Sequence, residues 1–105
     1  MEPNTETDAS ILLLLAKKTK AEARAAWIKE GGTVEGLRAA FHACILAKRF
    51  ARRAAEAWAS DERVSHALTE DADKLEIAAV ALNFRLVHAQ IAAEDAGVIQ
   101  QTSPQ

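Results

Sequence analysis

The sequence contains few residues that break helices and few that cross-link a chain. Its 105 residues include four glycines, two prolines and a single cysteine. One cysteine excludes an internal disulfide, which is compatible with a reducing compartment. Because glycine and proline are the strongest helix breakers, their scarcity favours long helices. No segment shows the alternation of apolar and polar residues that is typical of β-strands.

The sequence also lacks the usual signs of a targeting signal or a membrane span. The first eight residues contain no lysine or arginine, and the apolar run at 11–16 is six residues long. A secretory signal needs a basic beginning, and a spanning helix needs about 20 apolar residues. We therefore expect a cytoplasmic protein that does not enter a membrane.

No residue pattern points to catalysis, since there is no glycine-rich phosphate loop, no Gly-x-Ser-x-Gly and no Cys/His metal spacing. Glu62, His66 and Glu70 are spaced by four, so on one helix they share a face and could offer metal ligands. A di-metal site would also need Glu-x-x-His pairs on a second helix, and neither earlier helical segment has one. A polar surface stripe explains the spacing more simply. We predict no metal, no cofactor and no enzymatic activity.

The residues that are abundant favour an all-α fold. Half of the residues are hydrophobic and 27% are charged, a balance that is typical of a globular domain. Alanine, the best helix former, is the commonest residue. We predict a compact bundle of three to four helices at about 8–30, 34–59, 61–68 and 70–96, with the last two either separate or continuous. The single domain is expected to cover 8–97, between flexible tails at 1–7 and 98–105.

Capping residues and glycines set these boundaries. Gly31 and Gly32 end the first helix, because glycine adopts the left-handed C-cap conformation without a steric penalty. Thr33 caps the second helix, and Ser60 opens the third segment. Thr69, which two acidic residues follow, is another candidate start, so a short separate helix before it stays open.

The predicted helix at 34–59 has a basic face opposite a wide apolar one. At about 100° per residue, its apolar residues cover more than the usual stripe, so we place this helix centrally, between two neighbours. Cys44 lies on the apolar side, where a thiol is not expected to act as a nucleophile. The candidate partner-binding residues on the other side form the basic arc: Arg38, His42, Lys48, Arg49, Arg52 and Arg53.

The last predicted helix carries two apolar stripes on nearly opposite sides. The first stripe is a heptad seam made of Leu68, Ala72, Leu75, Ala79, Leu82, Leu86, Ala89 and Ala93. The second stripe consists of Ile77, Val80, Phe84, Val87 and Ile91. Either the first two helices each cover one stripe, or one stripe is a surface for another chain. We favour burial of the second stripe within the chain and keep self-association as the alternative, which leaves a monomer or a homodimer.

Charge is unevenly distributed along the chain. Residues 1–60 carry ten Lys/Arg and seven Asp/Glu, a net charge of +3, whereas residues 61–105 carry three and eight, a net charge of −5. Such asymmetry indicates either pairing within the molecule or surfaces of opposite sign for partners. Acidic residues available to the basic arc within the chain are Asp61, Glu62, Asp71 and Asp73.

These features predict a non-catalytic protein that acts by binding another macromolecule. It could be an adaptor, a small subunit of a complex, or an inhibitor that covers a site on another protein. The partner that we favour is a protein. Direct binding of nucleic acid through the basic arc is the alternative, because a row of arginines can follow phosphates.

In size and style the whole chain resembles the small inhibitors of phages and mobile elements, such as the anti-CRISPR proteins. The likeness consists of a small, all-helical chain with charge-segregated faces and no catalytic motif. It implies that the charged faces would occlude a complex that handles nucleic acid.

Overall fold

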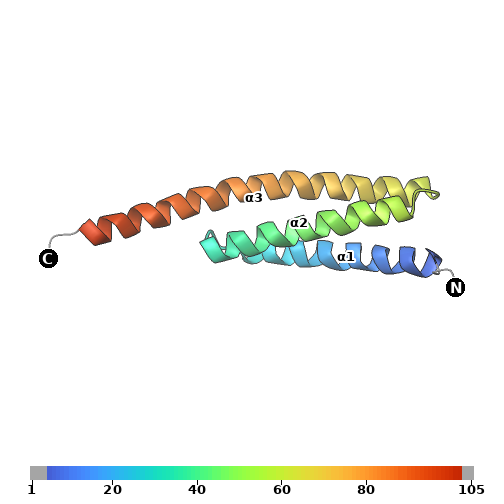
Figure 1. The fold of residues 1–105 in the computed structure, drawn as a ribbon, viewed down its shortest axis with the longest axis horizontal. Coiled ribbons are helices and arrows are strands. Elements are labelled where there is room, and N and C mark those ends of the chain that lie inside the picture. Colours follow the sequence, from blue (N-terminus) through green and yellow to red (C-terminus); the bar gives the residue numbers. More distant parts are fainter. Residues whose placement is uncertain (1–4, 103–105) are drawn as a thin grey trace.

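Three long helices make up the part of the chain that the structure describes. The computed structural model describes the backbone of residues 5–102 and the side chains of residues 8–97. The helices are α1 (Thr5–Lys29), α2 (Val34–Ala57) and α3 (Glu62–Thr102) (Figure 1). No strand occurs between residues 5 and 102, so the predicted all-α helical bundle is confirmed. The segments predicted at 61–68 and 70–96 belong to one continuous helix.

The helices at both ends of the chain are longer than predicted. Helix α1 begins at Thr5 rather than near residue 8, and α3 continues through Gly97 to Thr102. Gly97 does not end α3. A glycine C-cap has a positive φ, and among the described residues only Gly31 and Gly32 have one. Helix therefore extends into both segments that were predicted as flexible tails. The remaining residues of those segments lie outside the described part.

The turn between α1 and α2 is built on glycine. Gly31 and Gly32 have φ values of +57° and +75°, in the left-handed region that favours glycine. Thr33 then caps α2, because its side-chain oxygen accepts a hydrogen bond from the Gly36 amide at 3.0 Å. A Cβ atom at Gly36 would overlap the backbone of Glu30, 2.7 Å from its carbonyl carbon and 2.8 Å from its Cα. The end of α1 and the first turn of α2 are therefore in direct backbone contact.

The turn between α2 and α3 is fixed by polar side chains. The carboxylate of Asp61 accepts a hydrogen bond from the Val64 amide at 3.3 Å, so Asp61 caps α3 where the sequence suggested Ser60. The hydroxyl of Ser65 donates to the carbonyl oxygen of Ala55 at 2.9 Å. This hydrogen bond ties the first turns of α3 to the end of α2.

Helix α2 lies between α1 and α3, as the width of its apolar arc predicted. It packs against both neighbours, whereas no Cα atom of α1 comes within 8 Å of one in α3 in the described range. Figure 1 shows the three helices side by side, and the molecule measures 71 × 27 × 18 Å. Small residues dominate the buried face of α2, which lets both neighbours approach closely. Its buried residues are Leu37, Ala40, Cys44, Ala47, Ala51, Ala54 and Ala55.

Helix α3 packs on α2 through the first stripe and then continues beyond it. The fully buried members of the first stripe are Leu68, Ala72, Ala79, Leu82 and Leu86. From Ile91 to Ala96 every side chain is exposed. Figure 1 shows this end of α3 extending past the turn between α1 and α2. The three-helix core therefore ends well before α3 does.

By length and composition alone, the segment Glu62–Gly97 of α3 is also apolar enough to cross a membrane, although no run of about 20 apolar residues was found in the sequence. Part of this apolar character serves packing within the chain. Leu82 and Leu86 are buried in the first stripe. Between them in sequence, Arg85 pairs through its Nη2 with the Oε1 atom of Glu30, the residue that follows α1, at 2.7 Å.

Candidate binding surfaces

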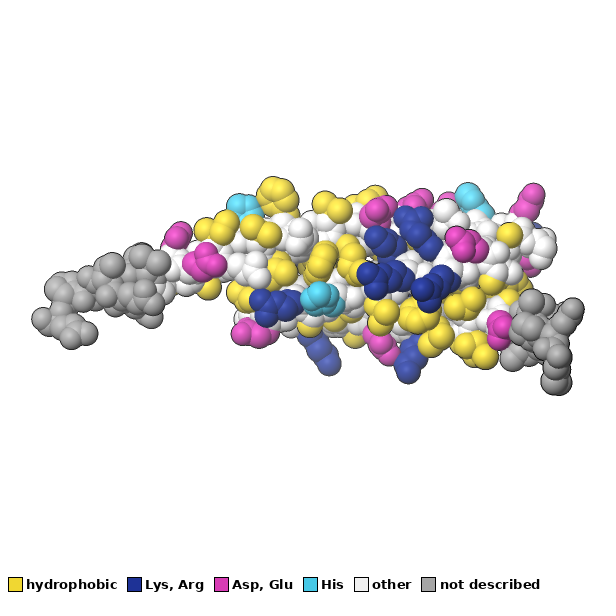
Figure 2. All heavy atoms as spheres, viewed as in Figure 1, with side chains coloured by type: hydrophobic (Ala, Val, Ile, Leu, Met, Phe, Trp, Pro, Cys, Tyr) yellow, Lys and Arg dark blue, Asp and Glu magenta, His cyan; other side chains and the backbone are white. Residues whose placement is uncertain are grey.

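The basic arc lies on the face of α2 that points away from the core. Arg38, His42, Arg49, Arg52 and Arg53 are exposed, and Lys48 is partly buried. Figure 2 shows lysine and arginine side chains gathered over the middle of the molecule. The structure therefore brings the predicted residues onto one surface, because they recur at helical spacing opposite the alanines that pack the core.

Acidic residues of α3 neutralise one member of the basic arc. The Nη2 atom of Arg52 lies 3.2 Å from Glu76 Oε2 and 3.5 Å from Asp73 Oδ1. Of the pairings considered from the sequence, the one with Asp73 is present. Arg49 and Arg53 form no ion pair with any side chain in residues 8–97. Some of the unevenly distributed charges therefore form ion pairs within the chain, and the others are exposed to solvent.

The second stripe of α3 is exposed, so the preference for burial within the chain is wrong. Its exposed fractions are 71% for Ile77, 63% for Val80, 68% for Phe84, 43% for Val87 and 50% for Ile91. The reason is the arrangement of the helices. Helix α2 covers the first stripe, and α1 lies on the far side of α2 rather than wrapping around α3. Nothing in residues 8–97 covers the opposite face of α3.

One histidine, His88, borders the second stripe. The ring of His88 lies 5.3 Å from the ring of Phe84, measured between centroids, with a tilt of 40°. The imidazole thus covers one edge of the aromatic ring while both side chains remain exposed. It adds a polar edge to an otherwise apolar row.

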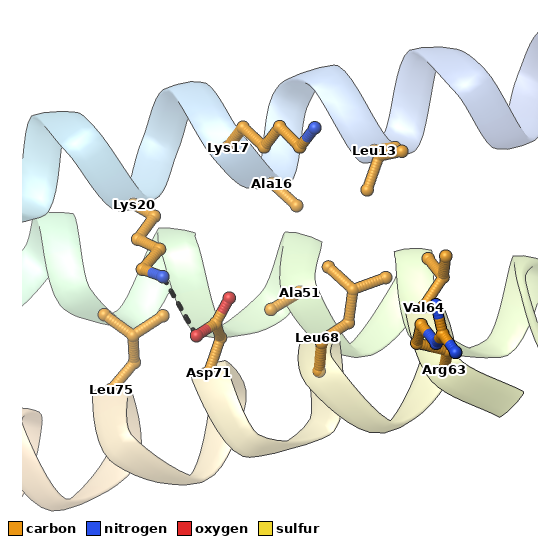
Figure 3. A pocket seen from close by; sticks show the side chains of 11 residues that line it. Leu13, Ala16, Lys17, Lys20, Ala51, Arg63, Val64, Leu68, Asp71 and Leu75 are labelled. Carbon is orange, nitrogen blue, oxygen red and sulfur yellow. Dashed lines mark hydrogen bonds and ion pairs between the residues drawn. The ribbon is translucent and has the colours of Figure 1, made fainter.

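A groove that the sequence did not reveal runs between α1 and α3. Its walls carry Ala16 of α1 and Leu68 of α3, and Ala51 of α2 lies at its floor (Figure 3). The part of the groove between these residues has a volume of about 340 Å³. Lys20 reaches across it and its Nζ atom lies 2.9 Å from Asp71 Oδ1. No signal in the sequence singles out this pair, since the two residues are 51 positions apart.

The groove continues beyond this ion pair. Its second part has a volume of about 410 Å³, and Trp27 and Ile28 of α1 contribute to its lining. Cys44 borders it from below and is only 1% exposed. Burial raises the pKa of the Cys44 thiol, which keeps it in the unreactive protonated form. The predicted position of Cys44 on the apolar side of its helix is confirmed.

The candidate metal ligands at the start of α3 form a surface pair. His66 Nε2 lies 3.1 Å from Glu70 Oε1, and the two side chains are 75% and 57% exposed. Within residues 8–97, no three His, Cys, Asp or Glu side chains are placed to hold a metal ion. The spacing of four therefore reflects a solvated face of α3. The absence of metal and cofactor stays a prediction.

Three surfaces of residues 8–97 are candidates for contact with other molecules. Two were predicted by residue number, the basic arc and the second stripe, and the groove was found in the structure. In comparisons with known proteins, no family model matches the chain, and neither the curated proteins nor the solved structures give a significant match.

Proposed function

We propose that this protein is a non-catalytic binding protein that uses the second stripe of α3 to hold another macromolecule. One observation supports the proposal above all others: five large apolar side chains lie in a row and are 43–71% exposed. Fully burying one such side chain contributes about 1.5–3 kcal/mol, so a macromolecule that covers the row gains considerable free energy. Contiguous apolar surface of this kind is typical of interaction sites.

The shape of the surface favours a macromolecule over a small ligand. Pockets for small molecules are concave and enclose most of the ligand. The second stripe instead lies on the convex outer side of a single helix. Such a row of residues at helical spacing fits a helix or a groove of another polypeptide.

The roles considered from the sequence all use a surface of this kind. An adaptor, a small subunit and an inhibitor each act by occupying a site on another molecule, and none needs a catalytic group. An inhibitor of the anti-CRISPR kind is one such role. In that role the basic arc, on another helix, supplies charge complementarity to an acidic site.

Site-specific photo-cross-linking in the native cells tests the proposal. A photoreactive phenylalanine analogue at Phe84 should give a covalent adduct, because this ring is 68% exposed at the centre of the second stripe. The matched control places the same analogue at Lys18, whose side chain is 72% exposed on α1. An adduct at position 84 and none at position 18 supports the proposal. Equal yields at both positions, or none at either, contradict it.

Nucleic-acid binding through the basic arc is a second candidate function. The observation in its favour is the exposure of Arg38, Arg49 and Arg53 on one side of α2. If they follow a phosphate backbone, the double variant Arg49→Glu/Arg53→Glu should abolish binding to random DNA and keep the helix content. The logarithm of the binding constant should also fall linearly with that of salt concentration. Failure of the wild-type protein to bind DNA at low salt rules this function out.

A further inference from the structure

We propose that the second stripe binds a second copy of this chain, with the two α3 helices side by side and antiparallel. This inference rests on the proposed function, because it names the macromolecule that covers the stripe. The antiparallel arrangement follows from the heptad spacing of the stripe, from the charges at its ends, and from the way α3 extends beyond α1 and α2.

The spacing of the second stripe is that of a coiled coil. Its residues follow one another at intervals of three, four, three and four, so they alternate between heptad positions a and d. Ile77, Phe84 and Ile91 occupy a, and Val80 and Val87 occupy d. The next d positions on either side are acidic, Asp73 and Glu94. The next a positions are Glu70 and Val98, so carboxylates bound the row at position d on both sides and at position a on one side.

The charges at the ends of the seam oppose a parallel pair. In a parallel pair each residue of the seam faces its own counterpart. Glu94, which forms no ion pair within residues 8–97, would then lie opposite Glu94 of the second copy, and Asp73, which pairs with Arg52, would lie opposite Asp73. Like charges in direct opposition destabilise an interface and act against that arrangement.

An antiparallel pair places apolar layers and opposite charges together. Position a then faces position d, so that Phe84 packs on Val87 of the second copy and Val80 packs on Ile91. By symmetry each layer occurs twice, which gives four apolar layers, and Ile77 faces Glu94 of the second copy at each end of the seam. In this register Lys74 and Asp95, both at position e, lie opposite each other at the two ends of the seam.

The charge pair also selects the register. Lys74 and Asp95 are both exposed, and neither forms an ion pair within residues 8–97. A shift by one heptad keeps four apolar layers but places Lys74 opposite His88 of the second copy. Two Lys–Asp pairs thus distinguish one antiparallel register from the next.

The shape of the molecule accommodates this dimer. Helix α2 packs on the opposite side of α3 and leaves the second stripe exposed, so a second copy can reach the stripe. The contact is centred near Arg85, where α3 leaves the end of the three-helix core (Figure 1). The second α3 therefore lies partly along the segment of α3 that packs on α2 and partly along the segment that continues beyond it. The two pairs of shorter helices point to opposite ends of the dimer.

Charge reversal measured by analytical ultracentrifugation tests both the dimer and its register. The wild-type chain should form a dimer. Lys74→Glu should weaken dimerisation about tenfold, because two attractive pairs become repulsive, and Asp95→Lys should have the same effect. The double variant Lys74→Glu/Asp95→Lys should restore the wild-type affinity. Lys18→Glu on α1 is the matched control and should leave it unchanged.

Disulfide cross-linking tests the direction of the helices without relying on charge. In an antiparallel pair, position 84 faces position 87 of the second copy. A mixture of the variants Phe84→Cys and Val87→Cys should therefore oxidise to a covalent dimer faster than either variant alone. In a parallel pair, Phe84→Cys alone would react fastest. The wild-type chain controls for Cys44, which is buried and should not cross-link.

The outcomes separate this inference from the proposed function. A chain that stays monomeric up to high concentration overturns the second copy as occupant. The proposed function then still stands if the cross-linker at position 84 gives an adduct of another mass, and it falls if no adduct forms. A dimer without rescue in the double charge variant, or with fastest cross-linking of Phe84→Cys alone, overturns the antiparallel register.

Discussion

At the scale of single residues, Gly36 is the position where the fold leaves least room for change. A methyl group there would overlap the backbone of Glu30, which cannot move aside as a flexible side chain does. Gly36→Ala should therefore lower the free energy of unfolding by about 1–3 kcal/mol. Gly97→Ala is the matched control, since no atom lies within 4 Å of its added Cβ. Urea unfolding checks both variants, and equal stabilities would contradict the close contact.

Glu30 links the end of α1 to α3 and makes stability depend on acid pH. The hydrogen bond from Arg85 holds the pKa of Glu30 below its ordinary value of 4.5, and the Gly32 amide adds to this effect. Unfolding returns the pKa to the ordinary value, so the unfolded state takes up the proton at a higher pH than the folded state. The stabilisation is complete above pH 4.5 and is lost as the pH falls below it.

Glu30→Gln should remove this part of the acid sensitivity. Its stability should be lower at neutral pH, and the difference from the wild type should shrink as the pH falls below 4.5. Urea unfolding at a series of pH values measures the difference in the free energy of unfolding between the variant and the wild type. Arg85→Gln should flatten the profile in the same way. A difference that stays constant down to low pH would show that the carboxylate is not held by its partners.

At the scale of the helix, α3 combines two stripes with opposite tolerance to charge. Phe84→Asp should leave helix content unchanged and shift the stability of the monomer by no more than about 0.5 kcal/mol, because the ring is exposed. Leu82→Asp, two residues away, should cost about 3–5 kcal/mol, because it buries an unpaired charge. Circular dichroism with thermal unfolding in dilute solution compares the two. A Phe84→Asp chain that unfolds would mean that the stripe is buried after all.

The helices themselves were largely predictable, because their signals are local. Thr33 and the two glycines before it mark one boundary correctly, since capping depends on a few adjacent residues. Both apolar stripes of α3 were also found from their spacing. Whether α3 continued past Thr69 and Gly97 could not be decided locally. Thr69 and Gly97 could each start or end a helix, but a helix ends there only if the chain turns. Because α3 packs on α2 without a turn at Thr69, the helix continues through it.

At the scale of the molecule, the open question was which side of α3 would be covered. The wide apolar arc predicted the central place of α2 correctly. The sequence could not show that α1 stays on the far side of α2. That depends on how closely helices approach over small side chains such as Ala47 and Ala54, and on the tight turn at Gly36. The groove and its Lys20–Asp71 pair were missed for the same reason, since both arise from distances between helices.

The basic arc and the second stripe lie on different helices and would bind by different forces. Salt should therefore weaken binding to the basic arc and leave binding through the second stripe largely unchanged. Contacts of the basic arc are electrostatic, and at about 0.1 M salt charges more than about 10 Å apart are largely screened. The second stripe works by burial of apolar surface, which does not depend on that screening. Raising the salt concentration should abolish binding of an acidic ligand to the arc while dimers formed through the stripe persist, with only the Lys74–Asp95 pairs weakened. Ultracentrifugation in a salt series, with and without random DNA, measures both. If the dimer dissociated as salt rose, its contact would be electrostatic, and the basic arc rather than Phe84 and its neighbours would have to form it.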